Sequence, residues 1–342
     1  MQLGDLGADV IKVERPGTGD ETRGYGPPFD ARGEAAYYLA CNRNKLAVAA
    51  DLDVAADREL IRALVASADI VIDNFKPGTL EQRGLAPTDF VDGHPRLVWC
   101  TVTGFGAESA RPGYDFVVQA ESGWMAVTGE RDGAPMKTGV AFADQITGRE
   151  VVAQVLAALA AIRGGVTAPR RLHVSLYHSA VQSLINVAQN HLVSGAEASR
   201  WGNAHANLVP YEMFNASDGP IVICVGNDAQ FAALAGVLGS AQLREDRFRT
   251  NAGRLAHRED VSREVAARVR SNTAAFWVTA LERAGVPAGV VRSVRDAVGT
   301  VGASALTGIA PPAPGSVRLP PPRLDEHGSL IRAHGWGAFA HV

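Results

Sequence analysis

Short apolar segments alternate with amphipathic helical segments along the first half of the chain, and this alternation restricts the fold most. Apolar runs of strand length occupy residues 9–13, 45–50, 69–73, 97–103 and 171–176. Apolar residues recur at helical spacing over residues 54–67, 149–162 and 177–193. Such alternation favours a parallel sheet covered by helices on both faces, with ligands bound by loops at the carboxyl ends of the strands.

A second, smaller α/β domain is predicted where the sequence changes character after residue 195. Residues 195–207 are rich in Gly, Asn and Ala, and Asp218-Gly219 is a tight turn before a strand at residues 220–225. Three helices and a strand are then predicted at residues 229–238, 259–270, 273–284 and 288–293. We therefore expect a large Rossmann-like domain with a parallel sheet in residues 1–195 and a small α/β domain in residues 208–295.

Composition and charge exclude several classes of protein. The 342 residues are 46% hydrophobic and carry a net charge of −3, with basic and acidic residues interspersed. There is no basic stripe for nucleic acid, and no apolar run approaches the ~20 residues of a membrane span. The three cysteines, Cys41, Cys100 and Cys224, lack metal-ligand spacing and are expected to be buried thiols of a reducing compartment. We expect a cytoplasmic protein that binds neither nucleic acid nor membrane.

Asp144 is the strongest candidate for chemistry because of its place in Lys137-Thr-Gly-Val-Ala-Phe-Ala-Asp144-Gln-Ile-Thr-Gly148. It lies at or just before the start of the helix predicted from residue 149. Free backbone N–H groups and the positive end of the helix dipole are expected to keep its carboxylate ionised, even where Phe142 excludes water. An ionised, poorly solvated carboxylate is a nucleophile. The alternative is an ordinary aspartate that only caps its helix, and position alone does not decide between the two.

Several common site patterns are missing from the sequence. There is no phosphate-binding Gly-x-x-x-x-Gly-Lys-Ser/Thr loop and no Gly-x-Gly-x-x-Gly after a strand. The closest histidine pair, His173 and His178, is separated by a predicted change from strand to helix, so we expect no metal site. No Gly-x-Ser-x-Gly elbow is present, which disfavours a serine hydrolase.

Five ordered segments together resemble class III CoA-transferases, the CaiB/BaiF family. They are residues 3–17, Asn42-Arg-Asn-Lys45, Asp73-Asn-Phe-Lys-Pro-Gly78, Arg111-Pro-Gly-Tyr-Asp115 and the Asp144 segment. The resemblance continues through Gly202-Asn203, Val209-Pro-Tyr211, Gly226-Asn-Asp228 and Glu326-His327. It implies the fold of that family, an interlocked homodimer, with residues 296–342 returning to pack on the large domain.

The resemblance also implies a reaction. The family aspartate that matches Asp144 attacks the thioester of a donor acyl-CoA, giving a mixed anhydride and then an aspartyl-CoA thioester, from which an acceptor acid takes the CoA. A covalent intermediate of this kind divides the transfer into easier steps, provided that water is excluded. No permanently bound cofactor and no metal are implied, since CoA and acyl-CoA are substrates. The donor and acceptor acids are not readable from the sequence.

Family correspondence places a set of residues beside CoA. Arg15 lies by the adenosine phosphates, Lys76 offers a point charge, and Phe75 offers a face for adenine. The remaining predicted contacts are Ala50, Asp51, Leu52, Asp53, Asn74, Arg83, Tyr114 and Asp115. The arginine of many members falls at the position of Gln82, whereas here it is the next residue, Arg83. The role of Asp115 stays open.

Two departures from the family and two alternative functions follow from the sequence. Family members begin about twenty residues earlier, with a strand and a Gly-Pro loop that approach the thioester. Either the start of this chain was assigned late, or the protein works without that element and a sheet edge is then exposed. Residues 203–207 lack the glycine run that covers the nucleophile in formyl-CoA transferases.

α-Methylacyl-CoA racemases use a histidine base where this chain has Tyr114, a poor base at neutral pH, so racemisation is disfavoured. A non-catalytic CoA-binding paralogue is the other alternative.

Overall fold

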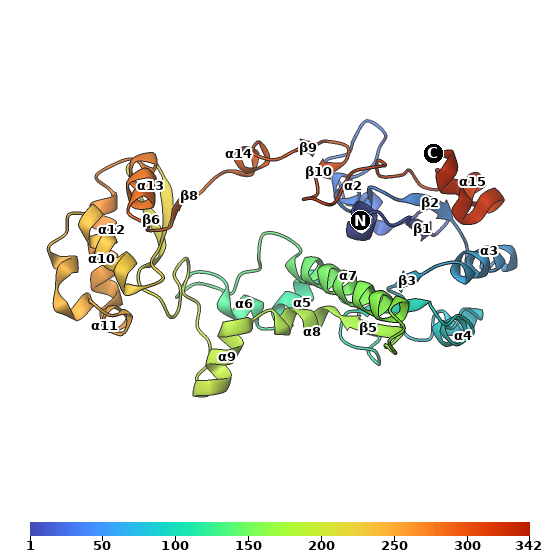
Figure 1. Cartoon of the computed structure of the whole chain (residues 1–342), viewed down its shortest axis with the longest axis horizontal. Coiled ribbons are helices and arrows are strands. Elements are labelled where there is room, and N and C mark those ends of the chain that lie inside the picture. Colours follow the sequence, from blue (N-terminus) through green and yellow to red (C-terminus); the bar gives the residue numbers. More distant parts are fainter. The chain divides into compact units, whose positions relative to one another are not determined.

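The computed structural model describes residues 1–342. The chain forms two compact units (Figure 1). The first unit contains Met1–Trp124, Thr138–Ile185 and Val298–Val342, and the second contains Met125–Lys137 and Asn186–Ala297. The predicted limits were 1–195 and 296–342 for the large domain and 208–295 for the small one. They placed Met125–Lys137 in the large domain, whereas the structure places this stretch in the second unit.

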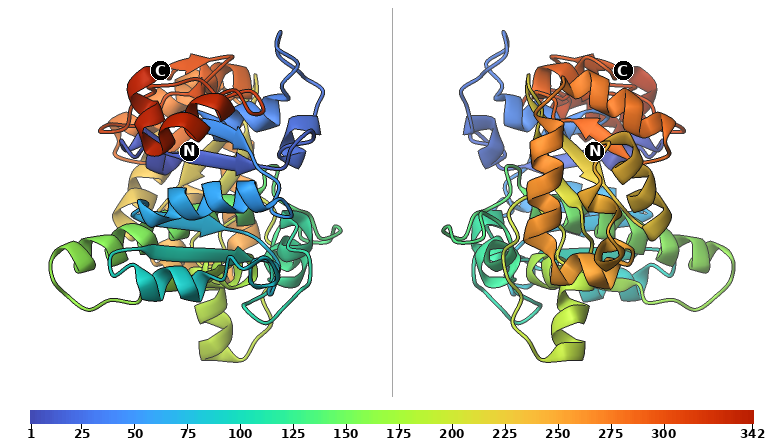
Figure 2. Two further views of the ribbon diagram at one scale, coloured as in Figure 1. Left: turned by 90° about the vertical axis from the view of Figure 1, so that its right-hand side faces the viewer. Right: turned by 90° about the vertical axis from the view of Figure 1, so that its left-hand side faces the viewer.

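The first unit is built on two parallel sheets. Strand β1 (Ile11–Glu14) pairs with β2 (Leu46–Ala49), with Ile11 opposite Leu46. Strand β4 (Val98–Thr103) lies between β3 (Ile70–Asp73) and β5 (Arg171–Ser175). The parallel α/β architecture expected from the sequence is confirmed, but the five strands form two separate ladders rather than the single sheet predicted, as two further views show (Figure 2).

Helices surround both sheets of the first unit. They are α1 (Gln2–Asp5), α2 (Ala36–Asn42), α3 (Ala55–Ala66), α4 (Pro87–Gly93), α5 (Asp115–Glu121), α7 (Phe142–Arg163), α8 (Leu176–Gln182) and α15 (Gly328–His334), with short 3₁₀ turns η1 (Glu21–Gly24), η2 (Glu81–Arg83) and η5 (Gly335–His341). Val151 and Val155 of α7 pack against Val98 and Cys100 of β4. Ile331 of α15 packs with β2, so the C-terminal segment closes the core over that strand.

One predicted helix is divided in the structure. Residues 177–193 were expected to form a single helix, but α8 ends at Gln182 and α9 (Ile185–Ser194) starts after a break. Ile185 has φ 37°, a left-handed conformation that a β-branched residue rarely adopts. Apolar spacing continues through the break, which is why periodicity alone did not reveal it.

The second unit has an antiparallel sheet of β6 (Tyr211–Asn215), β7 (Pro220–Cys224) and β8 (Ala288–Val290), in the order β6-β7-β8. Its helices are α10 (Asp228–Val237), α11 (Asn251–Ala256), α12 (Arg258–Val269) and α13 (Ala274–Arg283), with η3 (Gln242–Arg244) and η4 (Asp246–Phe248). Helices α6 (Trp124–Val127) and α9 also belong to it apart from their first residues, which are the last residues of segments of the first unit. Ile221, Phe231 and Trp277 belong to its buried core. The chain then passes through α14 (Val294–Val298), β9 (Ala303–Ser304) and β10 (Gly308–Ile309).

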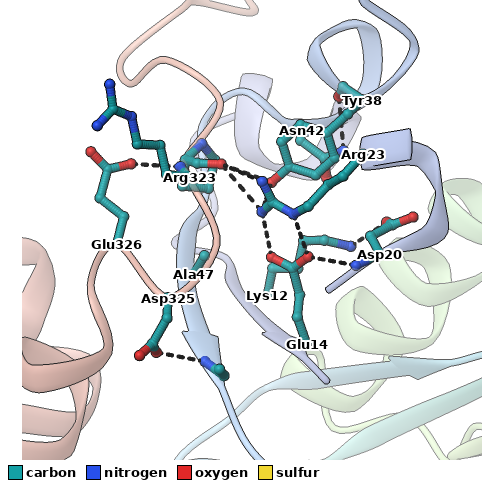
Figure 3. Close-up of polar contacts among 12 residues, drawn as sticks. Lys12, Glu14, Asp20, Arg23, Tyr38, Asn42, Ala47, Arg323, Asp325 and Glu326 are labelled. Atoms are coloured by element: carbon teal, nitrogen blue, oxygen red, sulfur yellow. Dashed lines mark hydrogen bonds and ion pairs between the residues drawn. The ribbon is translucent and has the colours of Figure 1, made fainter. Parts of the chain in front are cut away.

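Buried charges attach the C-terminal segment to the loops around β1 and β2. The Arg23 guanidinium donates to Glu14 at 2.7 Å, to the Tyr38 hydroxyl at 2.6 Å and to the Pro322 carbonyl at 3.3 Å (Figure 3). Asp325 accepts a hydrogen bond from the backbone N–H of Ala49 at 2.7 Å. These contacts fix the segment that follows β1, where Arg15 lies.

Helix α7 is the one helix that is long and apolar enough to cross a membrane by length and composition. The sequence expectation of no such segment is corrected on this point. One side of the helix packs into the core of the first unit through Thr147, Val151, Val155 and Ala158. Because core helices pass the same test, the helix is weak evidence for a membrane span.

Candidate active site

A cavity of about 1930 Å³ opens in the first unit, at the carboxyl ends of its parallel strands. Arg15 follows β1, Ala50 follows β2 and Asn74 follows β3, so loops far apart in sequence meet there. The lining includes every predicted site residue except Asp115: Arg15, Ala50, Asp51, Leu52, Asp53, Asn74, Phe75, Lys76, Arg83, Tyr114 and Asp144.

Asp144 is the third residue of α7 and lies on the lining of the cavity. No hydrogen bond or ion pair engages its carboxylate in the structure. Desolvation by the surrounding protein, with a smaller contribution from the negative charge of Asp115, raises the pKa of Asp144 from 3.8 to about 6. The helix terminus, which was expected from the sequence to favour the charged form, therefore does not outweigh desolvation. Because a pKa of about 6 lies below neutrality, the carboxylate is still mostly ionised at pH 7.

Asp115 does not face the cavity and binds the chain just before Asp144 instead. Its Oδ1 accepts a hydrogen bond from the backbone N–H of Ala143 at 2.7 Å. The loop that leads to it is held by a close backbone approach, since a Cβ added at Gly104 would lie 2.4 Å from Cα of Gly113. Only glycine fits there, which explains the Pro-Gly of the Arg111–Asp115 motif.

Three cations on the cavity lining have no partner in the structure: Arg15, Lys76 and Arg149. Arg83 differs, because its Nε lies 3.0 Å from Asp53 Oδ1 and its Nη1 donates to the Thr79 carbonyl at 3.1 Å. Unpaired cations beside a cavity of this size suit an anionic ligand with several phosphates.

Sequence reasoning missed three of the arginines on the cavity lining. One of them, Arg43, is paired with Asp5 at 2.8 Å and is not free to bind an anion. Arg149 is five residues beyond Asp144 on the same helix, and its position beside the candidate nucleophile was the available signal. Arg111 lies within one of the motifs, stacks over Phe105 at 4.0 Å and pairs with Glu121 at 2.6 Å. Its charge is therefore already partly neutralised.

The cysteines and histidines contribute little to the site. Cys100 is buried, and desolvation raises the pKa of its thiol to about 11. Cys41 is exposed and Cys224 partly so, which corrects the expectation that all three thiols are buried. The ring of His173 is hydrogen-bonded to Thr103 Oγ1 at 3.0 Å, and no group of three or more His, Cys, Asp or Glu side chains is arranged to hold a metal ion.

Comparison with known proteins decides the family. The model of CoA-transferase family III matches residues 1–309. The chain belongs to CoA-transferase family III. This confirms the resemblance carried by the five ordered segments. The protein is therefore a CoA-transferase, and the cavity that contains Asp144 is its candidate active site.

The CoA-transferase is similar to two enzymes along most of its length. It is 42% identical over 308 residues to the succinate–glutarate CoA-transferase of Agrobacterium fabrum, covering 86% of this chain and 76% of that protein. It is 39% identical over 306 residues to the succinyl-CoA:glutarate CoA-transferase of Mus musculus, covering 86% and 68%. The crystal structure of a CaiB/BaiF family protein from Brucella suis superposes with a TM-score of 0.80 at 40% identity, covering 97% and 93%.

Proposed function

We propose that Asp144 is the nucleophile that carries the acyl group and then CoA. A carboxylate oxygen of Asp144 attacks the thioester carbonyl of the donor, the C–S bond breaks, and CoA leaves as its thiolate. The thiolate attacks the Asp144 carbonyl of the mixed anhydride, which releases the donor acid and leaves an aspartyl-CoA thioester. The acceptor carboxylate then attacks this thioester, and the two steps run in reverse.

The observation that carries this proposal is the unpaired Asp144 carboxylate on the wall of the cavity. A carboxylate held by an arginine or by several N–H groups would be a weaker nucleophile, because those contacts stabilise its charge. Desolvation raises the pKa of Asp144 to about 6 and so increases its basicity without protonating it at neutral pH. Nucleophilic catalysis benefits from this combination.

Trapping tests the proposal. Incubation with acyl-CoA followed by hydroxylamine is expected to label residue 144 as a hydroxamate, which peptide mass spectrometry locates. Asp144→Ala is expected to lose transfer by a factor of about a thousand or more, because the covalent route is removed. Full transfer activity in Asp144→Ala would refute the role. Exchange of the α-proton without CoA transfer would support the racemase alternative, and tight CoA binding with neither activity would support the non-catalytic paralogue.

We further propose that CoA binds along the loops that follow β1, β2 and β3, with Arg15 and Lys76 at its phosphates and Phe75 against adenine. The lack of protein partners for both cations and the 41% exposure of Phe75 support this placement. Lys76→Ala is expected to raise KM for acyl-CoA about three- to tenfold, with the effect weakening at high salt. The matched control is Arg163→Ala, whose arginine pairs with Asp69 at the far end of α7. Equal effects of the two changes would refute the placement.

The proposed acids are short dicarboxylates, as in the names of the similar enzymes. Donor and acceptor identity is tested with succinyl-CoA against glutarate, oxalate and a monocarboxylic acid of equal length. A preference of at least tenfold for dicarboxylates is expected, since a second carboxylate adds a charge-assisted contact. Equal rates of CoA transfer to the dicarboxylic and monocarboxylic acids would refute the proposed preference.

The assembly and location are proposed from family membership alone. We propose an interlocked homodimer in the cytoplasm that carries no permanently bound cofactor. Light scattering after size exclusion tests the dimer, and a mass of one chain would contradict it.

A further inference from the structure

Gln119 is a fully buried amide on α5. All of its side-chain hydrogen bonds are to Asp115 or to the segment that precedes Asp144. Its Oε1 accepts from the backbone N–H of Thr138 at 2.9 Å and from the Thr138 hydroxyl at 3.3 Å. Its Nε2 donates to Asp115 Oδ2 at 2.6 Å and more weakly to the Val140 carbonyl at 3.4 Å. A buried amide with a complete set of partners is costly to disturb, so it fixes the conformation of the segment it binds.

Asp115 continues this chain of contacts to the nucleophile. Its Oδ2 binds Gln119, and its Oδ1 accepts from the N–H of Ala143, the residue before Asp144. Ala143 is itself fully buried and packs with Val118 of α5. Both ends of the segment Thr138–Ala143 are thus attached to α5, which lies beside α7 (Figure 1).

This attachment replaces the usual cap of α7. The residue before the helix, Ala141, has no side chain that can accept a hydrogen bond, and the first turn of a helix has N–H groups without internal partners. Asp115 satisfies one of them from another helix. A charged acceptor at a helix N-terminus is also favourable for the helix dipole.

We propose that Asp115 and Gln119 are a positioning pair that holds the backbone before Asp144 and so sets the place of the nucleophile relative to the bound thioester. The proposal rests on the proposed role of Asp144 in CoA transfer. Neither residue lines the cavity, so both act through Asp144 rather than on the substrate. A displacement of about 1 Å in a reacting group can cost about a hundredfold in rate.

The pair also places a charge near the nucleophile. Two titratable groups face Asp144 from neighbouring elements, Asp115 from α5 and Tyr37 from α2, whose phenol pKa is raised first by burial and then by the charge of Asp144. Asp115 therefore holds the position of Asp144 and increases its basicity through the same carboxylate.

Gln119→Leu tests the positioning role, because leucine fills a similar volume without hydrogen bonds. We expect kcat to fall about 10- to 100-fold while KM for acyl-CoA stays within about threefold, since the CoA-binding loops are unaffected. Hydrogen exchange measured by mass spectrometry is expected to accelerate in the peptide that covers residues 138–143. The control is Gln154→Leu on α7, which removes a half-buried amide that donates to Glu150 at 2.9 Å and should change neither quantity.

Asp115→Asn is the second variant and removes both the charge and the link to Gln119. The asparagine oxygen can still accept from Ala143, but the asparagine NH2 group then faces the donating Nε2 of Gln119, so that hydrogen bond is lost. Because the negative charge beside Asp144 is also lost, the acid limb of the kcat profile is expected to move to lower pH. A role confined to folding would lower the melting temperature without moving this limb.

The outcomes separate the two proposals. Unchanged kcat and unchanged exchange in a folded Gln119→Leu enzyme overturn the positioning pair. If that variant does not fold, unchanged kcat and unchanged exchange over residues 138–143 in a folded Asp115→Asn enzyme overturn it, because that change also breaks the link between the two residues. Failure of the nucleophile proposal would show separately, in the Asp144→Ala variant. That variant would then retain CoA transfer although Asp115 and Gln119 are unchanged.

Discussion

Replacing Asp144 by asparagine is expected to stabilise the protein above pH 6 and to leave its stability unchanged below about pH 4. The folded-state pKa of Asp144 is raised from 3.8 to about 6, so the folded protein retains a proton that the unfolded chain has already lost between these values. Stability contributed by the protonated form is present below pH 3.8 and is lost as the pH rises to about 6. Asparagine is neutral throughout and avoids this loss.

The size of the effect follows from the shift and from the exposure of the side chain. A shift of about two pKa units corresponds to at most about 3 kcal/mol at ~1.4 kcal/mol per unit. Asp144 is exposed to the cavity, and solvent there screens its charge, so about 1 kcal/mol is the better expectation. For a protein of this size that amounts to a rise in melting temperature of about 1–2 °C.

Thermal unfolding of the wild type and Asp144→Asn, measured in steps from pH 4 to pH 8, provides the test. The difference in melting temperature should grow between pH 4 and pH 6.5 and then level off. Asp92→Asn is the control, because Asp92 is exposed on α4 without a hydrogen bond or ion pair and should give a difference independent of pH. An Asp144→Asn variant with a lower melting temperature than wild type at pH 8 would show that the carboxylate is not desolvated. So would a difference in melting temperature that is the same at every pH.

Three further outcomes are expected. The kcat/KM of the wild type should fall below about pH 6, because protonated Asp144 is no nucleophile, and a flat profile down to pH 5 would contradict this. Asp5→Ala should destabilise the protein by about 3–5 kcal/mol in denaturant unfolding, since the buried Arg43 at 2.8 Å loses its partner, whereas a loss under 1 kcal/mol would count against a buried pair. Iodoacetamide at pH 8 should label Cys41 but not Cys100, whose thiol is buried with a pKa raised to about 11.

Short-range patterns in the sequence predicted much of the candidate site. Apolar runs and helical spacing located the strands of the first unit and helix α7, and ordered motifs identified the loops that line the cavity. These features are readable because periodicity reports which face of one element is buried. For the same reason the sequence indicated that Asp144 lies at a helix start, where the structure places it in the first turn.

Only the tertiary structure decided how these elements act on one another. Asp115 is far from Asp144 in sequence, so its hydrogen bond to Ala143 and its effect on the Asp144 pKa were not readable from spacing. The direction of that pKa shift depends on the balance of desolvation, helix dipole and neighbouring charge, which are properties of the space around a group. The exposure of Cys41 and the break before α9 were likewise visible only in the folded structure. Sequence thus specified the elements and the candidate nucleophile, whereas the protonation and placement of the Asp144 carboxylate arise from contacts through space.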